Sequence, residues 1–479
     1  MTENVRGVKT EGLELLVEPR IPADAVGDTQ GDSPVPPVPP VPEGALLLHI
    51  GVPKTGTTAI QNAFGTLAQQ SPGRLAELGM RMPGTPLQQA RGALSAVGSL
   101  VGYGGAGRKP YGAHHWQGLL DQLAENGPAR PGALRQFVSS EYFCEARPKQ
   151  VKQVVADLAG YDPHVVVTLR PLARILPSAW QQYLKSGHQL PYEEWLHAVL
   201  DDPPRKDVTP SFWRRHDHGA VVSRWAGAVG ADRTVVMVLD PTDRELIYRS
   251  FAHLMALPDG LLREGGATRE GLENRSMTAA ESELFRQINV VLRSSAMPWD
   301  DYAHLVRYGA IARAVRNGTP PDAETALRTP QWALDRAAEL GGRYVEAIRA
   351  SGARVIGDLE LLAAPPAPAR PAVDVETVPV TVAVEALLGA VARSTRGESW
   401  FETEQVEPSE TDGLGAGAAD GEGDASRTEV RTHGRAVRDS TPIGRLTTGE
   451  LLTVVRARVA RGVRRRYLKA KFTARRRGR

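Results

Sequence analysis

Cysteine is almost absent from this chain, since Cys144 is the single one in 479 residues. A lone cysteine excludes an internal disulfide and a metal site built from clustered cysteines, so we expect a reducing compartment. Long hydrophobic runs are also lacking. No N-terminal apolar stretch has the form of a signal peptide, and none reaches the roughly 18 residues that span a bilayer. The sequence therefore predicts a cytoplasmic protein, with at most a peripheral contact at the inner membrane face.

The composition divides the chain into four parts. Residues 1–43 form a Pro-rich arm, whose run PVPPVPPVP at 34–42 favours a stiff, extended polyproline II spacer without a core. Residues 361–440 are rich in Ala, Pro, Gly and acids and poor in large apolar groups, which predicts a low-complexity linker. Residues 44–360 remain as the folded domain, and residues 441–479 form a tail.

The tail concentrates positive charge. The last 24 residues hold twelve Lys or Arg and no acid, while the whole chain carries only +3, so the remainder is acidic. Apolar residues partly line one helical stripe there: Leu451, Leu452, Val454, Val455, Val459 and Val463. Such a basic amphipathic helix suits an anionic membrane surface, and the alternative is a helix solvated on all sides. A nucleic-acid partner is disfavoured, because only Tyr467 and Phe472 are available to stack on bases.

The segment ALLLHIGVPKTGTTAIQ at 45–61 has the sequence of a phosphate-binding loop. An apolar run at Ala45–Ile50 predicts a buried strand, Gly51 and Gly56 permit tight backbone geometry, and the following residues begin a helix. The backbone amides of such a helix start attract an anion. The pattern is not the nucleotide-kinase loop G-x-x-x-x-G-K-[ST], because Thr57 stands where that Lys belongs and Lys54 lies within the loop.

A second segment has an independent anion-binding pattern. Val165–Leu169 is a β-branched run that suits an interior parallel strand, and Arg170 follows at its carboxyl end, where open α/β sheets bind ligands. Ser178 comes eight residues later on a predicted helix. An arginine presents a planar fork to two phosphate oxygens, and a hydroxyl can bond a third.

Together the two segments resemble the sulfotransferases of the soluble bacterial type, whose donor is 3′-phosphoadenosine 5′-phosphosulfate. PKTGTT at 53–58 looks like their 5′-phosphosulfate loop, and Arg170 with Ser178 looks like their 3′-phosphate site. The resemblance implies a P-loop-like α/β fold and sulfuryl transfer to a hydroxyl, less often an amine, with no metal required. It assigns Lys54 to charge stabilisation on the departing phosphate. The implied donor-binding residues are Pro53, Lys54, Thr55, Gly56, Thr57, Thr58, Arg170 and Ser178.

The remaining pattern agrees with a three-layer α/β fold, in which a mostly parallel central sheet is flanked by helices. Further strands are expected at 80–82, 134–139 and 234–239, and helices at 57–68, 149–158, 278–295, 301–316 and 331–350. Residues 84–112 are rich in glycine with little sustained periodicity, which is typical of a loop or lid on the acceptor side and equally of slack connecting chain.

The base that takes the acceptor proton has several candidates. Glu141, within FVSSEYF after the predicted strand, stands where relatives carry a His or Glu, and partial burial raises a carboxyl pKa toward the range of a base. The alternative is that Ser139, Ser140 and Glu141 only cap the next turn. His49 and the pair His114–His115 are rival bases.

One further residue and two other functions complete the predictions. Arg275, in ENRSM before a strong helix, resembles a late donor-site segment of bacterial relatives, and the alternative is a surface arginine beside a helix cap. A P-loop kinase or NTPase is disfavoured by Thr57 and by Asp240 being the only loose Mg²⁺ ligand. A non-catalytic nucleotide-binding scaffold is the other alternative. The acceptor, a glycan, lipid or metabolite, is not identified by the sequence.

Overall fold

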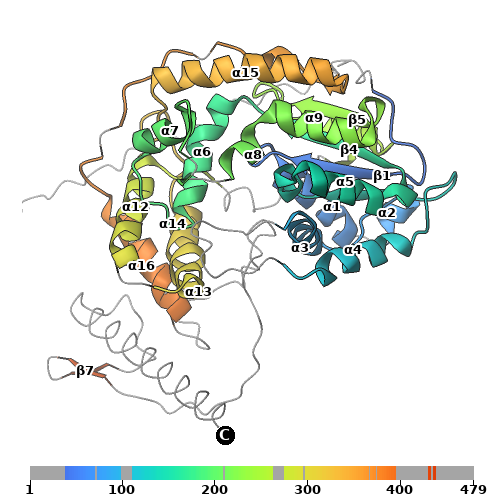
Figure 1. Ribbon diagram of the computed structural model, residues 1–479. Helices are drawn as coiled ribbons and strands as arrows, with labels where there is room; N and C mark the ends of the chain where they lie inside the picture. The colour runs from blue at the N-terminus through green and yellow to red at the C-terminus, as the bar shows by residue number, and fades with distance from the viewer. Residues whose placement is uncertain are drawn as a thin grey trace, which may run out of the picture. The chain divides into compact units, whose positions relative to one another are not determined.

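The computed structural model describes most of the central chain (Figure 1). The described residues are 38–70, 73–98, 111–205, 207–208, 211–262, 275–294, 297–365, 367–373, 375–394, 430–432 and 435–437. Contacts divide the chain into two units, Met1–Val35 and Pro36–Arg479, and every described residue belongs to the second. The predicted basic tail at 441–479 lies outside the described residues, as does most of the Pro-rich arm.

A six-stranded sheet forms the centre of this unit, with strand order β2-β3-β1-β4-β5-β6. Its strands are β1 (Leu46–Gly51), β2 (Met80–Arg81), β3 (Arg135–Ser139), β4 (Pro163–Leu169), β5 (Thr234–Val238) and β6 (Arg354–Ile356). Every neighbouring pair in this sheet is parallel. The predicted α/β class with a parallel central sheet is therefore confirmed. A separate antiparallel pair joins β7 (Val430–Thr432) and β8 (Arg435–Val437).

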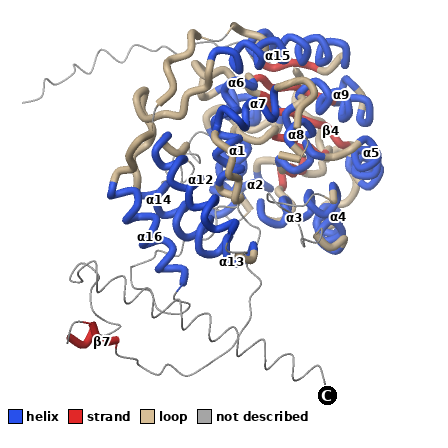
Figure 2. The backbone as a smooth tube through the Cα atoms, turned by 60° about the vertical axis from the view of Figure 1, so that its left-hand side comes forward, coloured by secondary structure: helices blue, strands red, loops and turns tan. Residues whose placement is uncertain are grey.

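The strands are apolar on both faces because helices cover both. Leu46, Leu48 and Ile50 of β1 point into one hydrophobic cluster, and Leu47 points into the other. Both clusters are buried, which explains why β1 and β4 appear in the sequence as continuous apolar runs rather than alternating ones. The Leu47 side is covered by α1 (Thr57–Gln70) and α10 (Leu246–Leu254). The opposite side is covered by helices that include α5 (Pro148–Asp157) and α9 (His218–Val229) (Figures 1 and 2).

The helices that surround the sheet have the following bounds. The first half of the unit contains α1 (Thr57–Gln70), α2 (Arg74–Glu77), α3 (Pro86–Val97), α4 (His114–Ala124), η2 (Glu141–Glu145), α5 (Pro148–Asp157), η3 (Ala159–Tyr161), α6 (Leu172–Leu184) and α7 (Tyr192–Leu200). The second half contains α8 (Phe212–His216), α9 (His218–Val229), η4 (Ala231–Arg233), α10 (Leu246–Leu254), α12 (Ala279–Ser294), α13 (Trp299–Tyr302), η6 (Ala303–Ile311), α14 (Ala312–Asn317), α15 (Gln331–Ser351), η7 (Leu359–Leu362) and α16 (Val380–Ser394). The run 299–317 is helical throughout, with a π-helix, η6, in its middle.

The expectation of a loop over 84–112 is wrong for its first half. Residues 86–97 form α3, which a capping box between Thr85 and Gln88 begins, with Pro86 in the first turn. Its buried residues Ala90, Ala93, Leu94 and Val97 recur at helical spacing. Because three of these are small or β-branched, the apolar stripe is weak in the sequence. Residues 99–110 lie outside the described part.

The edges of the folded domain also differ from the predicted ones. The last residues of the predicted Pro-rich arm belong to the folded domain. Val38 and Val41 are buried, and the Val41 amide donates to the Leu254 carbonyl at 2.9 Å. Within the predicted linker, α16 packs against η6, where Gly309 and Gly389 approach closely. Small residues permit this close contact, since Ala386 and Gly389 of α16 are buried there.

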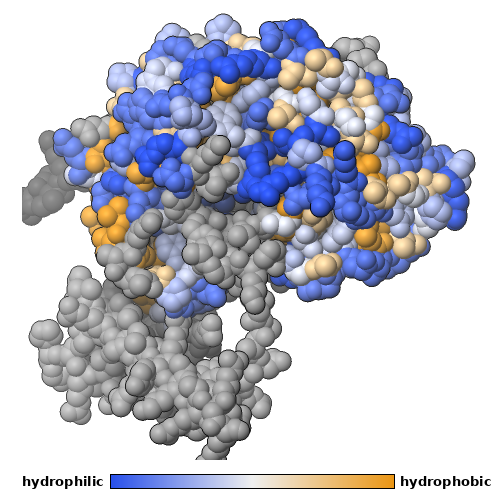
Figure 3. Space-filling view, viewed as in Figure 1, coloured by the Kyte–Doolittle hydropathy of each residue, from blue (hydrophilic) through white to orange (hydrophobic). Residues whose placement is uncertain are grey.

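The outer surface of two helices is partly apolar. Large exposed apolar side chains occur on α12 and α16, namely Val290, Val291, Val380, Val384 and Leu387. Figure 3 shows an orange, hydrophobic area on the left-hand side of the molecule, where α12 and α16 lie in Figure 1. None of the described helices combines the length and the apolar character that a bilayer crossing requires.

Candidate functional site

The loop between β1 and α1 is built on tight backbone geometry. Gly51 has no space for a side chain, because a Cβ there would overlap the Thr57 hydroxyl. Gly56 has φ +83°, and a Cβ on it would lie 2.8 Å from Ile247 Cδ1. Lys54 also has positive φ, +73°, a conformation that strains a residue with a side chain. The loop thus holds a strained conformation with Lys54 exposed at its tip.

Buried hydroxyls and an imidazole attach this loop to the sheet. The Thr55 hydroxyl donates to the Val52 carbonyl at 2.6 Å and lies 2.8 Å from the Thr168 hydroxyl on β4. His49 Nε2 lies 3.1 Å from Thr168 Oγ1, and its Nδ1 lies 2.9 Å from Ser139 Oγ on β3. Since the Thr55 proton is used, the Thr168 hydroxyl donates to Thr55, and His49 Nε2–H donates to Thr168.

His49 has the environment of a structural residue. Its side chain is 0% exposed, and burial lowers its pKa to about 3. Both ring nitrogens are engaged by neighbouring hydroxyls. A neutral, enclosed imidazole supports the loop, and it has no path to an acceptor proton, which makes it the weaker candidate base.

Thr57 is the first residue of α1 and carries a buried polar atom without a partner. Its side chain is 3% exposed, and Oγ1 makes no hydrogen bond within the described residues. The first turn of α1 contains no acidic residue, so the positive end of the helix is not neutralised by the chain. A phosphate oxygen at this position would satisfy the hydroxyl and the free amides of the first turn. The residues present therefore fit an anionic group.

Arg170 lies at the same edge of the sheet as this loop. It follows β4 directly, and β4 pairs with β1 up to Gly51. Its Nη1 donates to the Lys54 carbonyl oxygen at 3.5 Å, which brings the two predicted anion-binding segments together. Burial lowers the pKa of Arg170, and the nearby Arg174 guanidinium lowers it further. Within the described part of the chain, neither arginine has a carboxylate at ion-pair distance.

Ser178 and Arg174 lie one helical turn apart on α6. Ser178 is half-buried, and its hydroxyl donates to the Ile175 carbonyl at 2.9 Å. Arg174 is exposed and precedes Ser178 by four residues, a spacing that puts both on one face of the helix. Arg174 was not among the predicted residues, although its spacing from Ser178 is visible in the sequence.

Glu141 begins the 3₁₀ turn η2, directly after β3. The Ser140 amide donates to the His49 carbonyl at 3.1 Å, which holds this turn beside β1. The Ser140 hydroxyl accepts from the Tyr142 amide at 3.3 Å, so capping is the role of Ser140, and half-buried Glu141 lies at the carboxyl edge of the sheet. In the same turn, Glu145 is buried in an ion pair with Arg215 of α8. This pair was not predicted.

The other predicted residues lie in structural contacts. His114 and His115 begin α4, where their rings contact each other and the His115 ring also contacts Tyr111. Asp240 Oδ1 accepts from the Thr242 amide and hydroxyl, and these bonds lower its pKa. Among the described residues, no group of three or more His, Cys, Asp or Glu is placed to hold a metal ion.

Arg275 forms a bidentate ion pair with Glu281. Its Nη2 lies 2.6 Å from Oε1 and its Nη1 lies 2.8 Å from Oε2, with the side chain 5% exposed. It also donates to the Ala314 carbonyl at 3.2 Å. The guanidinium therefore joins the start of α12 to α14, which is not the arrangement of a phosphate contact at the loop.

The comparisons with known proteins found one distant likeness. No family model and no curated protein matches the chain. Among solved structures, the chain resembles a sulfotransferase from Alicyclobacillus acidocaldarius with 15% identity and a TM-score of 0.32. The match covers 53% of this chain and 95% of that one. Because the identity and the TM-score are both low, the likeness carries no argument about the site, and the properties of the site are derived from its own residues.

Proposed function

We propose that the protein is a sulfotransferase that uses 3′-phosphoadenosine 5′-phosphosulfate and transfers the sulfuryl group to a hydroxyl of an acceptor. The observation that carries this proposal is the meeting of the 53–58 loop with Arg170 at one edge of the sheet. Two anion-binding elements that lie side by side suit a nucleotide that carries a phosphate on both its 3′ and its 5′ oxygen. The unpartnered Thr57 hydroxyl supports a group with oxygen acceptors at the helix start.

The chemistry needs few groups, and this chain offers each of them. In the transfer, the bond from sulfur to the 5′-phosphate oxygen breaks and a bond from sulfur to the acceptor oxygen forms. The electron pair leaves with the phosphate, where Lys54 would stabilise the negative charge. The acceptor proton passes to a base, and Glu141 is the candidate at the correct edge. Arg170, with Ser178 and exposed Arg174, would bind the 3′-phosphate.

Binding of adenosine 3′,5′-bisphosphate, measured by calorimetry without Mg²⁺, tests the donor site. We expect binding that Arg170→Ala weakens and that Lys149→Ala, an exposed lysine on α5, leaves unchanged. Adenosine 5′-monophosphate should bind more weakly and be insensitive to Arg170→Ala, since it lacks the 3′-phosphate. Binding of ATP that requires Mg²⁺, with none of the bisphosphate, would overturn the proposal in favour of a kinase or NTPase.

Activity requires an acceptor, which cell extracts can supply. Labelled donor is incubated with extract and either the natural protein or Lys54→Ala, and products heavier by one sulfuryl group are sought by mass spectrometry. Products that depend on Lys54 support the enzyme. Tight bisphosphate binding with no such product favours the non-catalytic scaffold.

A further inference from the structure

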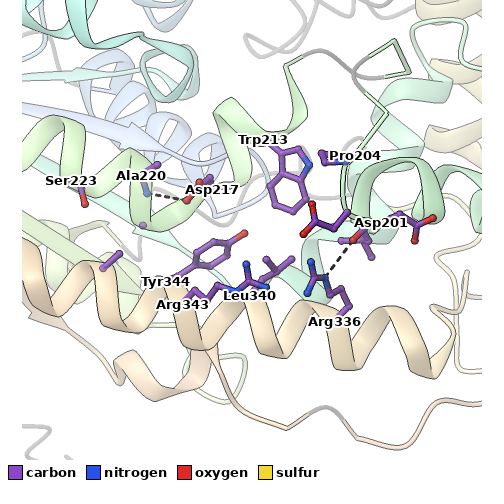
Figure 4. A pocket seen from close by; sticks show the side chains of 14 residues that line it. Asp201, Pro204, Trp213, Asp217, Ala220, Ser223, Arg336, Leu340, Arg343 and Tyr344 are labelled. Atoms are coloured by element: carbon purple, nitrogen blue, oxygen red, sulfur yellow. Dashed lines mark hydrogen bonds between the residues drawn. The ribbon is translucent and has the colours of Figure 1, made fainter.

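A second cavity lies apart from the phosphate-binding loop. It has a volume of about 510 Å³, is open to solvent, and is lined by the end of α7, by α8, by the start of α9 and by α15 (Figure 4). That volume is within the usual range for small-molecule sites. Its lining includes no residue of the 53–58 loop and neither Arg170 nor Ser178.

One wall of this cavity is a fixed aromatic ring. Trp213 of α8 lines it, and the indole Nε1 donates to the Val199 carbonyl at 3.0 Å. Because that donor is used, Trp213 offers a ligand carbon surface alone. Leu200 and Leu340 add apolar surface beside it.

The charged part of the lining consists of three carboxylates and two guanidiniums. Asp201, Asp202 and Asp217 line the cavity. Asp217 Oδ1 accepts from the Ala220 amide at 2.9 Å, which fixes it at the start of α9. Arg336 and Arg343 both bind Glu339, each at 2.6 Å, so a further carboxylate already offsets their charge. Acidic groups exceed basic ones, which disfavours a phosphate or sulfate ligand.

A buried hydroxyl without a partner points into the cavity. Tyr344 of α15 is 5% exposed, and its OH makes no hydrogen bond in the described part of the chain. Figure 4 shows its ring directed toward Asp217 and Trp213. A polar atom left in this state costs free energy unless a ligand or water bonds it. Tyr344 thus marks a position where a ligand polar group is missing.

We propose that this pocket binds an uncharged saccharide. A sugar ring has a face of C–H groups, which suits Trp213, and an edge of hydroxyls. Those hydroxyls can donate to Asp202 and Asp217 and accept from Arg336. A wholly apolar ligand would leave the carboxylates desolvated, and an anionic one would meet their repulsion.

Helix α8 connects the pocket to the turn that carries Glu141. Trp213 of this helix lines the pocket, and Arg215, two residues later, pairs with Glu145 in the turn that begins with Glu141. Saccharide binding does not require sulfuryl transfer. Only the use of the pocket to hold a glycan acceptor rests on the proposed function.

Saturation-transfer NMR of the full chain with neutral mono- and disaccharides (glucose, galactose, mannose, N-acetylglucosamine, maltose and trehalose) tests the pocket. Two conservative variants keep the fold: Asp202→Asn on an exposed loop, and Tyr344→Phe, which removes a hydroxyl that bonds to nothing in the described chain. Each is expected to weaken binding about tenfold, as for one hydrogen bond. Asp259→Asn, an exposed aspartate outside the pocket, is the matched control and should change nothing.

The outcomes separate this proposal from the proposed function. Binding of no sugar in the panel, or binding unaffected by Asp202→Asn and Tyr344→Phe, would overturn the pocket. Sulfated and phosphorylated forms of the same sugars are tested in the same way, and stronger binding of these forms would overturn the proposal that the ligand is uncharged. Binding of adenosine 3′,5′-bisphosphate is measured on the same protein. If the protein binds a saccharide but not the bisphosphate, only the proposed sulfotransferase function is contradicted. If it binds the bisphosphate but no saccharide, only the proposed pocket is contradicted.

Discussion

Arg170 donates a hydrogen bond from Nη1 to the carbonyl oxygen of Lys54 at 3.5 Å, although 116 residues separate them in the chain. The contact exists because β1 and β4 are adjacent and parallel, so the residues after each strand meet at one edge. It places a guanidinium against the loop that carries the exposed lysine. This relationship is the basis of the proposed donor site.

Lys54 combines backbone strain with an exposed position, which separates stability from function. With φ at +73°, glycine is favoured there, so Lys54→Gly should raise the free energy of unfolding by about 1 kcal/mol. Lys54→Ala keeps the strain and should leave stability within about 0.5 kcal/mol. Both variants should lower sulfuryl transfer about 100-fold or more. Urea unfolding and product assays measure this, and full activity in Lys54→Gly would contradict the role of the ammonium.

Thr57 and Thr55 form a matched pair of hydroxyls in one loop. Thr57→Val removes a buried group without a partner, so stability should rise by about 1 kcal/mol while bisphosphate affinity falls about tenfold. Thr55→Val breaks the bond to the Val52 carbonyl and should cost about 1–3 kcal/mol. Urea unfolding and calorimetry compare the two. If Thr57→Val destabilises as much as Thr55→Val, its hydroxyl has a partner in solution.

The sequence predicted those features that reside in short segments. β1 and β4 were predictable because a strand buried on both faces is a continuous apolar run, and the loop residues follow β1 directly. The network of His49, Thr168 and Ser139 was not, since it joins positions 90 to 119 residues apart. No local pattern carries such a contact.

Helices that pack through small residues were not predicted from the sequence either. The buried residues of α16 are Ala386, Gly389 and Val391, whereas its larger residues Val380, Val384 and Leu387 are exposed, so its apolar residues do not mark the face that packs, and the composition around the helix resembles a linker. Tertiary packing supplies what the sequence pattern lacks. The pocket at α8 and α15 was missed for a related reason, because it combines residues from four helices.

His49 should make the protein sensitive to acid. Burial depresses its folded pKa to about 3, below the unfolded value of 6.5, so the unfolded chain binds more protons between these values. Its contribution is therefore complete above pH 6.5 and is lost as the pH falls toward 3, by up to about 1.4 kcal/mol per pH unit. His218, also lowered to about 3, adds to this loss.

Urea unfolding at pH 7.5, 6 and 5 measures this slope. His49→Gln should be less stable at pH 7.5, because it disturbs two buried hydroxyl contacts, but its stability should fall less steeply with acid. His114→Gln, on the exposed start of α4, is the control and should keep the natural slope. An unchanged slope in His49→Gln would show that this imidazole is not held neutral by burial.

Whether α16 belongs to the folded domain can be decided with two glycines. A Cβ on Gly389 would overlap the Gly309 carbonyl of η6, so Gly389→Ala must push the helices apart and should cost about 1–3 kcal/mol. Gly342 of α15 has no atom within 4 Å of such a Cβ, and Gly342→Ala should stabilise by about 0.5–1 kcal/mol through helix propensity. Thermal unfolding measures both variants. If α16 did not pack against η6, Gly389→Ala would stabilise the protein as Gly342→Ala does. An equal gain at both positions would restore residues 380–394 to the linker.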